Sequence, residues 1–355
     1  MSKPIQVHIL GAGAMGSLLT HDLSTQFPQT FQPTIFLKPG TANMDTKTIK
    51  LSRQIGPNWT TTNVTVNTIK PVDFLASITK YDKHGHIDNL IISTKAHQTT
   101  SAITPFIPYL SKSSNLLIVQ NGMGRVNFLR EKFWADSCPN IYEVVATHGA
   151  YIDEGIVRHA SPGKLTIARH PSAQSTATPD IVNMILDTPS LNADLVDYNQ
   201  FLIVQCEKLI VNCCINPLTA LFDCFNGDLL HGGQELTLIF TRIIQEALSV
   251  LHKEYPLSSI PEASVFLNQA RLLNHVLTIV KATRKNSSSM RQDVRMLRNT
   301  EVDNLNGYVG YLGRKHDVNT GLNRMIAELV KVKLNINKGV NQGVLDSILD
   351  VSSIN

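Results

Sequence analysis

The stretch IQVHILGAGAMG, residues 5–16, places a short apolar run directly before a glycine-rich turn. The run predicts a β-strand, and leucines at positions 18, 19 and 23 predict a helix after the turn. In the pattern G-x-G-x-x-G, the first glycine permits a tight turn, the second lets the backbone approach a pyrophosphate, and the third lets helix and strand pack closely. Free N–H groups at a helix N-terminus favour phosphate binding. We therefore predict a dinucleotide site, rather than a coincidental glycine-rich turn, at Gly11, Ala12, Gly13, Ala14, Met15 and Gly16.

Outward from this turn, the first half of the chain alternates strand-like runs with helix-length segments. The further strand candidates are residues 34–37, 89–93, 115–119 and, more weakly, 143–146. Near-continuous apolar strands separated by helices are typical of a parallel sheet covered on both faces. A Pro-Gly turn within residues 155–168 predicts a hairpin that finishes the sheet.

The second half of the chain has a different sequence pattern, with helical periodicity and few strand-like runs. The predicted helical patterns cover residues 202–221, 235–253, 261–284, 289–312 and 322–336. We therefore predict an α/β protein with an N-terminal Rossmann-type doubly wound sheet in residues 1–200. An all-α C-terminal domain follows in residues 201–355, with the boundary near residue 200.

Composition limits the possible functions. The 355 residues suggest two domains of roughly 150 residues each. A net charge of +4, from 32 basic and 28 acidic residues, is too weak to indicate nucleic-acid binding. No run of 18 apolar residues predicts a membrane span, and residues 1–10 do not resemble a leader. Five cysteines without a C-x-x-C pair suggest a reducing compartment, so we expect a cytoplasmic protein, with a mitochondrial role left open. The histidines have no metal-ligand spacing, and no metal is expected.

The residues after the predicted strands indicate the cofactor. NAD-binding domains place an acid at the end of the second strand to bind the ribose 2′-OH. Here the residues at 36–39 are FLKP, and Lys38 suits the 2′-phosphate of NADP unless it is an ordinary surface lysine. Lys95 and Asn121 follow two later strands, where ligands of doubly wound sheets bind. They are candidate cofactor contacts, although either could be a plain loop residue.

One helical segment carries a polar line through apolar surroundings. Lys208, Asn212 and Asn216 are spaced by four, so they share a helix face, and Pro217 is expected to end or kink this helix. A partly buried lysine is a good general acid, because desolvation lowers its pKa toward neutrality. The alternative is a lysine that reaches solvent, with two asparagines at a helix cap.

A carboxylate interrupts the apolar stripe predicted for residues 289–312. Glu301 lies four residues after Leu297 and four before Leu305. A buried carboxylate needs a cation or a ligand hydroxyl as its partner, so Glu301 is a candidate site residue. The alternative is a structural salt bridge, for example with Arg298. The serines at 287–289 are candidates to cap this helix.

These residues lie in motifs that resemble those of the ketopantoate reductases, also called 2-dehydropantoate 2-reductases. The similarity covers nearly the whole chain. The motifs are GAGAMG (11–16), TKAHQ (94–98), QNGMGR (120–125), THGA (147–150), EKLIVNCCINPLTAL (207–221), NGDLL (226–230) and SSMRQDVRMLRNTEVDNLNG (288–307).

The resemblance implies a role for each matching position. Lys208 corresponds to the catalytic lysine that supplies the proton, and Glu301 to the glutamate that contacts the nicotinamide-side ribose and supports the lysine. The positions that hold the substrate are Lys208, Asn212, Asn216, Asn226 and Ser289. The matching cofactor contacts are Lys95, Asn121 and Ala150. The region around Lys38 matches less well, because a lysine stands where an arginine often does, and residues 41–68 and 170–180 diverge most.

The implied reaction is NADPH-dependent reduction of 2-dehydropantoate to D-pantoate, on the route to pantothenate and coenzyme A. Hydride passes from nicotinamide C4 to the C2 carbonyl, and Lys208 acts as general acid. The partner is a small molecule, with neither nucleic acid nor membrane, and the protein is expected to be a monomer or a homodimer. Two alternatives stay open: a reductase of another 2-oxo acid on the same fold, or a non-catalytic NADPH sensor.

Overall fold

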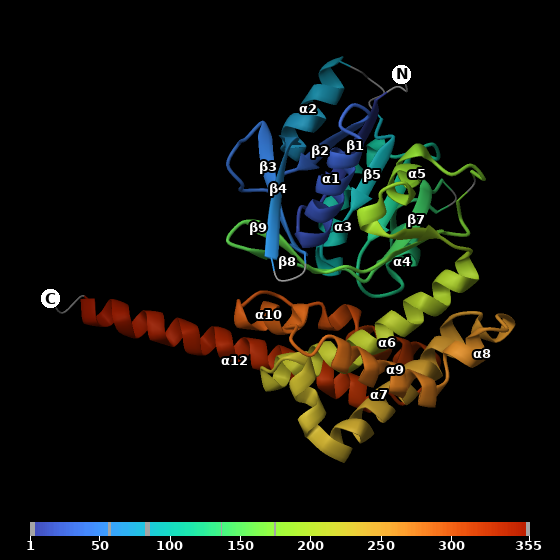
Figure 1. Cartoon of the computed structure of the whole chain (residues 1–355), viewed down its shortest axis with the longest axis vertical. Helices are drawn as coiled ribbons and strands as arrows, with labels where there is room; N and C mark the ends of the chain where they lie inside the picture. The colour runs from blue at the N-terminus through green and yellow to red at the C-terminus, as the bar shows by residue number, and fades with distance from the viewer. Residues whose placement is uncertain (1–3, 56–57, 82–85, 136, 174, 353–355) are drawn as a thin grey trace. The chain divides into compact units, whose positions relative to one another are not determined.

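The computed structural model describes residues 4–55, 58–81, 86–135, 137–173 and 175–352. Of the N-terminal residues 1–10, which were not expected to form a leader, the first three lie outside the described residues. Its contacts divide the chain into two compact units, Met1–Leu202 and Ile203–Asn355. We call them the sheet unit and the helical unit (Figure 1). The predicted fold class is confirmed, with a Rossmann-type unit followed by a unit whose described residues form helices and turns.

The centre of the sheet is a set of parallel strands in the order β7-β6-β5-β1-β2. These strands are β1 (Ile5–Leu10), β2 (Phe31–Phe36), β5 (Asn89–Ile92), β6 (Asn115–Val119) and β7 (Asn140–Ala146). Each is largely apolar because helices cover both faces. The covering helices are α1 (Ala14–Gln26), α2 (Pro71–Tyr81), α3 (Thr99–Ile103), α4 (Arg125–Phe133) and α5 (Asp180–Leu186).

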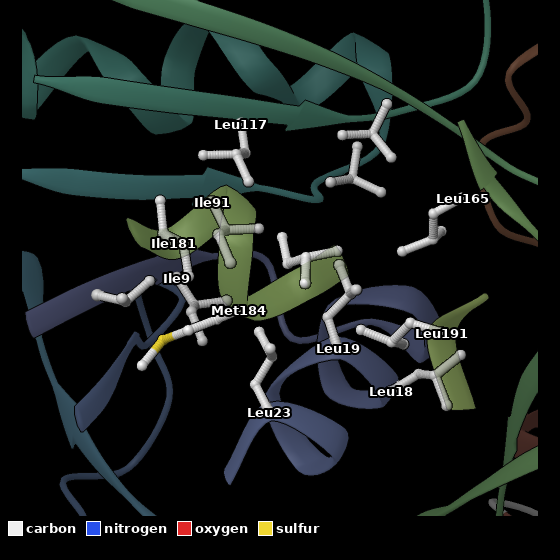
Figure 2. Close-up of a cluster of buried hydrophobic side chains, with 14 of the residues drawn as sticks. Ile9, Leu18, Leu19, Leu23, Ile91, Leu117, Leu165, Ile181, Met184 and Leu191 are labelled. Atoms are coloured by element: carbon white, nitrogen blue, oxygen red, sulfur yellow. The ribbon is translucent and has the colours of Figure 1, made fainter. Parts of the chain in front are cut away.

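Two hydrophobic clusters lie on opposite faces of this sheet. Successive residues Ile9 and Leu10 belong to different clusters, as the alternation of a strand requires. Figure 2 shows the first cluster, in which leucines of α1 and side chains of α5 meet the central strands. The second cluster joins the other strand face to α2, α3 and α4. This double covering fixes the position of the turn between β1 and α1.

The edges of the sheet differ from the prediction, and the complete sheet is mixed. The described strands run in the order β11-β10-β7-β6-β5-β1-β2-β4-β3-β9-β8. The additional strands are β3 (Thr46–Ile55), β4 (Asn58–Ile69), β8 (Gly149–Asp153), β9 (Ile156–Ser161), β10 (Leu165–Arg169) and β11 (Ala193–Leu195). The hairpin predicted within residues 155–168 is wrong. β9 pairs with β3 and β8, whereas β10 pairs with β7 and β11, because more distant strands outcompete the local turn.

Hydrogen bonds attach α1 to the added strands. Asp22 accepts hydrogen bonds from Arg53 of β3 and from Ser190, and it also contacts its neighbour His21. Burial alone would raise the pKa of Asp22, but the hydrogen bonds with His21, Arg53 and Ser190 lower it to about 2. His21 in turn contacts Thr62 of β4 at 3.0 Å. The residues from 41 to 68 therefore support the helix that follows the glycine turn.

The helical unit contains the predicted helices with three corrections. Its elements are α6 (Tyr198–Phe222), η4 (Asn226–Gly232), α7 (Gly233–Glu254), η5 (Leu257–Ser259), α8 (Ala263–Phe266), α9 (Gln269–Ala282), α10 (Ser289–Arg295), η6 (Val302–Asn304), α11 (Asn306–His316) and α12 (Gly321–Ser352). The continuous helix predicted for 289–312 is wrong, because Leu297 adopts a left-handed φ of 55° after α10. Pro217 does not end α6, which continues to Phe222. The continuous helix predicted for 261–284 is also wrong, because Leu267 and Asn268 leave the helical conformation and Asn268 caps a new helix, α9.

Helix α6 is long and apolar enough, by length and composition, to cross a membrane. Most of it is buried in the structure, as in a core helix of a globular domain. Its cysteines Cys206, Cys213 and Cys214 are buried and unpaired, and burial raises the pKa of each thiol. These thiols therefore stay protonated and act as small core residues.

Candidate functional site

The glycine turn has the geometry that a pyrophosphate requires. Gly11 has a φ of +107°, and a Cβ there would lie 2.6 Å from the amide nitrogen of Thr94. A Cβ on Gly16 would lie 2.1 Å from the carbonyl oxygen of Gly11. Gly13, by contrast, is the N-cap of α1 and has no side-chain cap. A Cβ added there would have no atom of a described residue within 4 Å, apart from its two chain neighbours. The space above Gly13 and the helix N-terminus therefore fit a bound phosphate group.

The loops after β1, β5 and β6 are joined at the carboxyl edge of the sheet. Ser93 donates from its hydroxyl to the carbonyl of Gly11 at 2.5 Å. Gln120 donates to the carbonyl of Thr94 at 2.5 Å. Lys95 and Asn121 directly follow Thr94 and Gln120, and both are half-buried. The structure thus brings these two predicted cofactor residues to the strand ends beside the glycine turn.

Lys38 lies exposed just beyond β2, and a second lysine lies near it. The end of β2 contacts β4 through Leu37 N–H and the Ile69 carbonyl at 2.9 Å. The end of β4 contacts the start of β3 through Thr68 N–H and the Asp45 carbonyl at 2.8 Å. Lys47, on β3, is half-buried, and burial together with the nearby charge of Lys38 lowers its pKa. Two like charges close together favour an anion between them.

Ala150 lies on β8, beside a bulge between Gly149 and Ala150. It packs on the same hydrophobic cluster as Ala12 and Met15 of the glycine turn. Strand β8 also contacts α1. The third predicted loop contact of the cofactor is therefore near α1, although it lies on an edge strand rather than at a central strand end.

Helix α6 displays the predicted polar line. Lys208, Asn212 and Asn216 are half-buried, whereas the residues that flank them on the helix are mostly buried and apolar. Burial lowers the pKa of Lys208 to about 8, and the charge of Glu301 acts in the opposite direction. The lysine is thus protonated at neutral pH, and its proton is more acidic than that of a solvated lysine.

Glu301 lies in a turn, at the N-terminus of η6, and not in the middle of a buried helical stripe. It is half-buried, so the predicted continuous apolar stripe is wrong even though the residue lies near the lysine. Arg298, the alternative salt-bridge partner, pairs with Asp293 at 3.3 Å. The charge of Glu301 therefore acts on Lys208, an interaction that sequence spacing alone did not predict.

Asn226 and Ser289 are held near the end of α6. The Asn226 side chain donates to the Thr283 hydroxyl at 2.9 Å, and its Oδ1 is buried without a hydrogen-bond partner among the described residues. Ser288 caps α10, and Thr219 of α6 donates to the Ser288 hydroxyl at 2.7 Å. Ser289, the next residue, is exposed. A buried acceptor without a donor is uncommon and suits a residue that awaits a ligand.

Sequence reasoning missed Lys47, because the strand that carries it was not predicted. The available signal was the alternation of apolar Ile49 and Leu51 with polar residues in the segment TKTIKLSRQI (46–55). The predicted cofactor residues lie in the sheet unit, except Glu301, and the predicted substrate residues lie in the helical unit. Among the described residues, no group of three His, Cys, Asp or Glu side chains could hold a metal ion.

Comparison with protein families places this arrangement in a known group. Residues 7–172 match the family model described as ketopantoate reductase PanE/ApbA. Residues 200–334 match the model described as ketopantoate reductase PanE/ApbA C terminal. The two matches together cover most of the chain and include every candidate site residue.

Individual relatives agree with this match. A protein of Schizosaccharomyces pombe named probable 2-dehydropantoate 2-reductase is 33% identical, with 94% of this chain and 97% of the relative covered. The 2-dehydropantoate 2-reductase of Saccharomyces cerevisiae is 31% identical, with 94% and 95% covered. Among solved structures, D-mandelate dehydrogenase with NADH and anilino(oxo)acetate has a TM-score of 0.72 at 20% identity. That match covers 94% of this chain and 100% of the other.

Proposed function

The chain belongs to the ketopantoate reductase family, and on this premise we propose that it reduces 2-dehydropantoate to D-pantoate with NADPH. Its named relatives are oxidoreductases of that substrate, which supports the reaction class. The observation that carries the proposal is the half-buried Lys208 beside the charge of Glu301, on a helix face shared with Asn212 and Asn216. We further propose that the product serves pantothenate and coenzyme A synthesis in the cytoplasm, and that the protein is a monomer or a homodimer.

In the proposed mechanism, Lys208 donates a hydrogen bond to the C2 carbonyl oxygen and then its proton as negative charge develops there. The bound reduced nicotinamide supplies the hydride. A cation at the atom that becomes negative stabilises the transition state more than the ground state. Glu301 favours the protonated form of Lys208, and its carboxylate would hold the nicotinamide-side ribose.

The remaining helical-unit residues orient the substrate in this proposal. Asn212 and Asn216 present amide groups on the same face as Lys208. Asn226, whose buried Oδ1 accepts from no described residue, is suited to a substrate hydroxyl. Ser289 and the asparagines suit the hydroxyl and carboxylate groups of a small polar acid. Positioning of this kind lowers the barrier because the reacting groups are already aligned.

In the sheet unit, the glycine turn is assigned to the cofactor pyrophosphate. Gly13 leaves room for the phosphates, whereas Gly11 and Gly16 allow the close packing that shapes the turn. Ala12, Ala14 and Met15 are the other residues of the turn. Lys95, Asn121 and Ala150 are assigned to the rest of the cofactor, and Lys38 to the 2′-phosphate.

Absorbance of the reduced cofactor provides the direct test. NADPH consumption with 2-dehydropantoate, and little consumption with NADH, is the expected result. Equal rates with NADPH and NADH would support the proposed reaction but contradict the assignment of Lys38 to the 2′-phosphate. If NADPH raises the melting temperature but no oxo acid is reduced, the protein is a sensor and the proposed reaction is wrong.

A second candidate is reduction of a different 2-oxo acid. The structural similarity to D-mandelate dehydrogenase, a protein solved with an aromatic oxo acid, favours testing this case. A panel of aliphatic and aromatic 2-oxo acids separates the two. A kcat/KM for an aromatic acid above that for 2-dehydropantoate would favour the second candidate.

The pH dependence of turnover follows from the pKa of Lys208, which is about 8. Because the general acid works in its protonated form, kcat/KM should be flat below about pH 7 and fall tenfold per pH unit well above pH 8. Since the Glu301 carboxylate raises the pKa of Lys208, Glu301→Gln should move this decline to lower pH. A decline that stays in place in Glu301→Gln would contradict the coupling of the two residues.

We also assign Lys47, which lies near Lys38, to the proposed 2′-phosphate site. Replacing Lys47 by glutamine should lower kcat/KM for NADPH about tenfold, because one charge-assisted contact is lost, and should leave NADH almost unaffected. The matched control is Lys50→Gln, since Lys50 is an exposed lysine three residues further along the same strand. A loss with NADPH and NADH alike, or an equal loss in the control, would remove Lys47 from the site.

A further inference from the structure

Pro217 leaves a gap in the hydrogen bonding of α6. Proline has no N–H group, so the carbonyl four residues earlier, that of Cys213, loses its helical donor. Both residues are buried in the interior of the helix. A buried carbonyl requires a donor from elsewhere, because water does not reach it.

Asn306 supplies that donor. Its side-chain amide donates to the Cys213 carbonyl at 3.1 Å, and the residue is 0% exposed. The same amide nitrogen donates to Asn323 Oδ1 at 3.0 Å. Two acceptors on one nitrogen fix the orientation of the amide, so its N–H groups cannot be exchanged for its oxygen.

The network continues away from α6. Asn323, on α12, donates to Glu246 of α7 at 2.8 Å. Glu246 also accepts from the backbone N–H groups of Leu322 and Asn323, at 3.0 and 2.9 Å, and so caps the start of α12. Within this network, Asn306 is the residue that donates to the Cys213 carbonyl, which lacks its helical donor because residue 217 is proline.

The hydrogen bond from Asn306 to the Cys213 carbonyl joins two segments that carry residues of the proposed site. Cys213 lies between Asn212 and Asn216 and five residues after Lys208, whereas Asn306 lies five residues after Glu301. We propose that Asn306 is a positioning residue that holds the α6 turn carrying Asn212 and Asn216 at a fixed distance from the segment beginning at Glu301. This inference rests on the proposed function, because it assigns Asn306 to the alignment of the general acid and its carboxylate.

Asn306→Leu tests the proposal, because it keeps the approximate volume and removes the donor. We expect kcat/KM for 2-dehydropantoate to fall about tenfold, while the Kd of NADPH stays within about twofold. The pKa of Lys208 should fall below its wild-type value of about 8, because Glu301 is no longer held near it. The pKa is measured directly by NMR of the lysine Cε signal, assigned with Lys208→Arg, so that this readout is independent of turnover.

Rescue separates positioning from general destabilisation. In Asn306→Leu/Pro217→Ala, the new N–H of residue 217 can donate to the Cys213 carbonyl, so the melting temperature should recover. The values of kcat/KM and of the Lys208 pKa should stay low, because α6 is still not hydrogen-bonded to the segment that carries residue 306. The matched control is Glu246→Gln, which weakens the same network at its far end and leaves the Cys213 contact intact. This control should lower the melting temperature without moving the pKa of Lys208.

Each outcome decides between the two proposals. An unchanged Lys208 pKa in Asn306→Leu, recovery of kcat/KM and of the Lys208 pKa in the double variant, or an equal effect of Glu246→Gln on that pKa would overturn the role of Asn306. If the wild-type protein reduces no oxo acid, but the Lys208 pKa falls in Asn306→Leu and stays low in the double variant, the positioning role stands and the proposed function fails.

Discussion

Lys208→Ala is expected to lower kcat for 2-dehydropantoate about 10²–10³-fold, while the Kd of NADPH stays within about twofold. The proposed role of Lys208 is confined to the carbonyl oxygen, so its loss removes stabilisation of the developing charge and the proton it would donate. The pKa of about 8 supports this role, because the group is protonated at neutral pH and gives up its proton more readily than a solvated lysine.

Stopped-flow measurement of NADPH oxidation, together with titration of NADPH by its fluorescence, checks both parts of this expectation. Lys281→Ala is a suitable control, because Lys281 is exposed on α9 of the same unit. Turnover within about tenfold of wild type in Lys208→Ala would refute the assignment of the general acid. A parallel loss of NADPH binding would indicate instead that the lysine acts on the cofactor.

The parts of the fold that the sequence predicts well are those set by local pattern. The glycine turn of residues 11–16 is recognisable because only glycine tolerates the close approaches at Gly11 and Gly16. The polar face of α6 is recognisable because a period of four persists through apolar residues. Both features depend on residues that are neighbours in the chain.

The parts that sequence reasoning missed depend on distant partners. β4 exposes most of its first half, so it lacks the apolar signature of a central strand although its threonines and valines favour a strand. The turn at residues 161–164 predicts a hairpin, but its flanking strands pair with β3 and β7 instead. The sequence of a turn does not predict which distant strands the flanking strands pair with.

The carboxylate beside Lys208 shows the same limit within the site. Leu297 interrupts the predicted helix in a left-handed conformation that leucine rarely adopts. No glycine or proline beside it in the sequence predicts this interruption. Glu301 therefore reaches the vicinity of Lys208 from a turn, by packing of the helical unit. Motif resemblance identifies the residue, while helical periodicity predicts the wrong local structure for it.

Gly13→Ala and Gly16→Ala are expected to have opposite kinds of effect, although both replace a glycine of the same turn. Gly16→Ala places a Cβ 2.1 Å from the Gly11 carbonyl oxygen and 2.2 Å from the Ser93 hydroxyl. The turn must move, so we expect the free energy of unfolding to fall by about 1–3 kcal/mol or more. A melting temperature lower by about 5 °C, without any ligand, checks this.

In Gly13→Ala the new methyl group meets no described residue within 4 Å beyond its chain neighbours, and the φ of −73° at Gly13 suits alanine. Reduced entropy of the unfolded chain and the poorer N-cap act in opposite directions, so the stability of the ligand-free protein should change by less than about 1 kcal/mol. The new methyl group would nevertheless occupy the space assigned to the pyrophosphate, and we expect the Kd of NADPH to rise at least about tenfold.

The Gly13→Ala result decides what the turn is for. If residues 11–16 form only a tight turn, Gly13→Ala should be harmless in every assay, because, apart from the chain neighbours of Gly13, no described residue contacts the added carbon. A protein that melts at the wild-type temperature but no longer gains stability from NADPH is expected only if the open space at Gly13 is a binding site. The separation of stability from affinity in one variant therefore supports the dinucleotide assignment more strongly than a loss of both in Gly16→Ala.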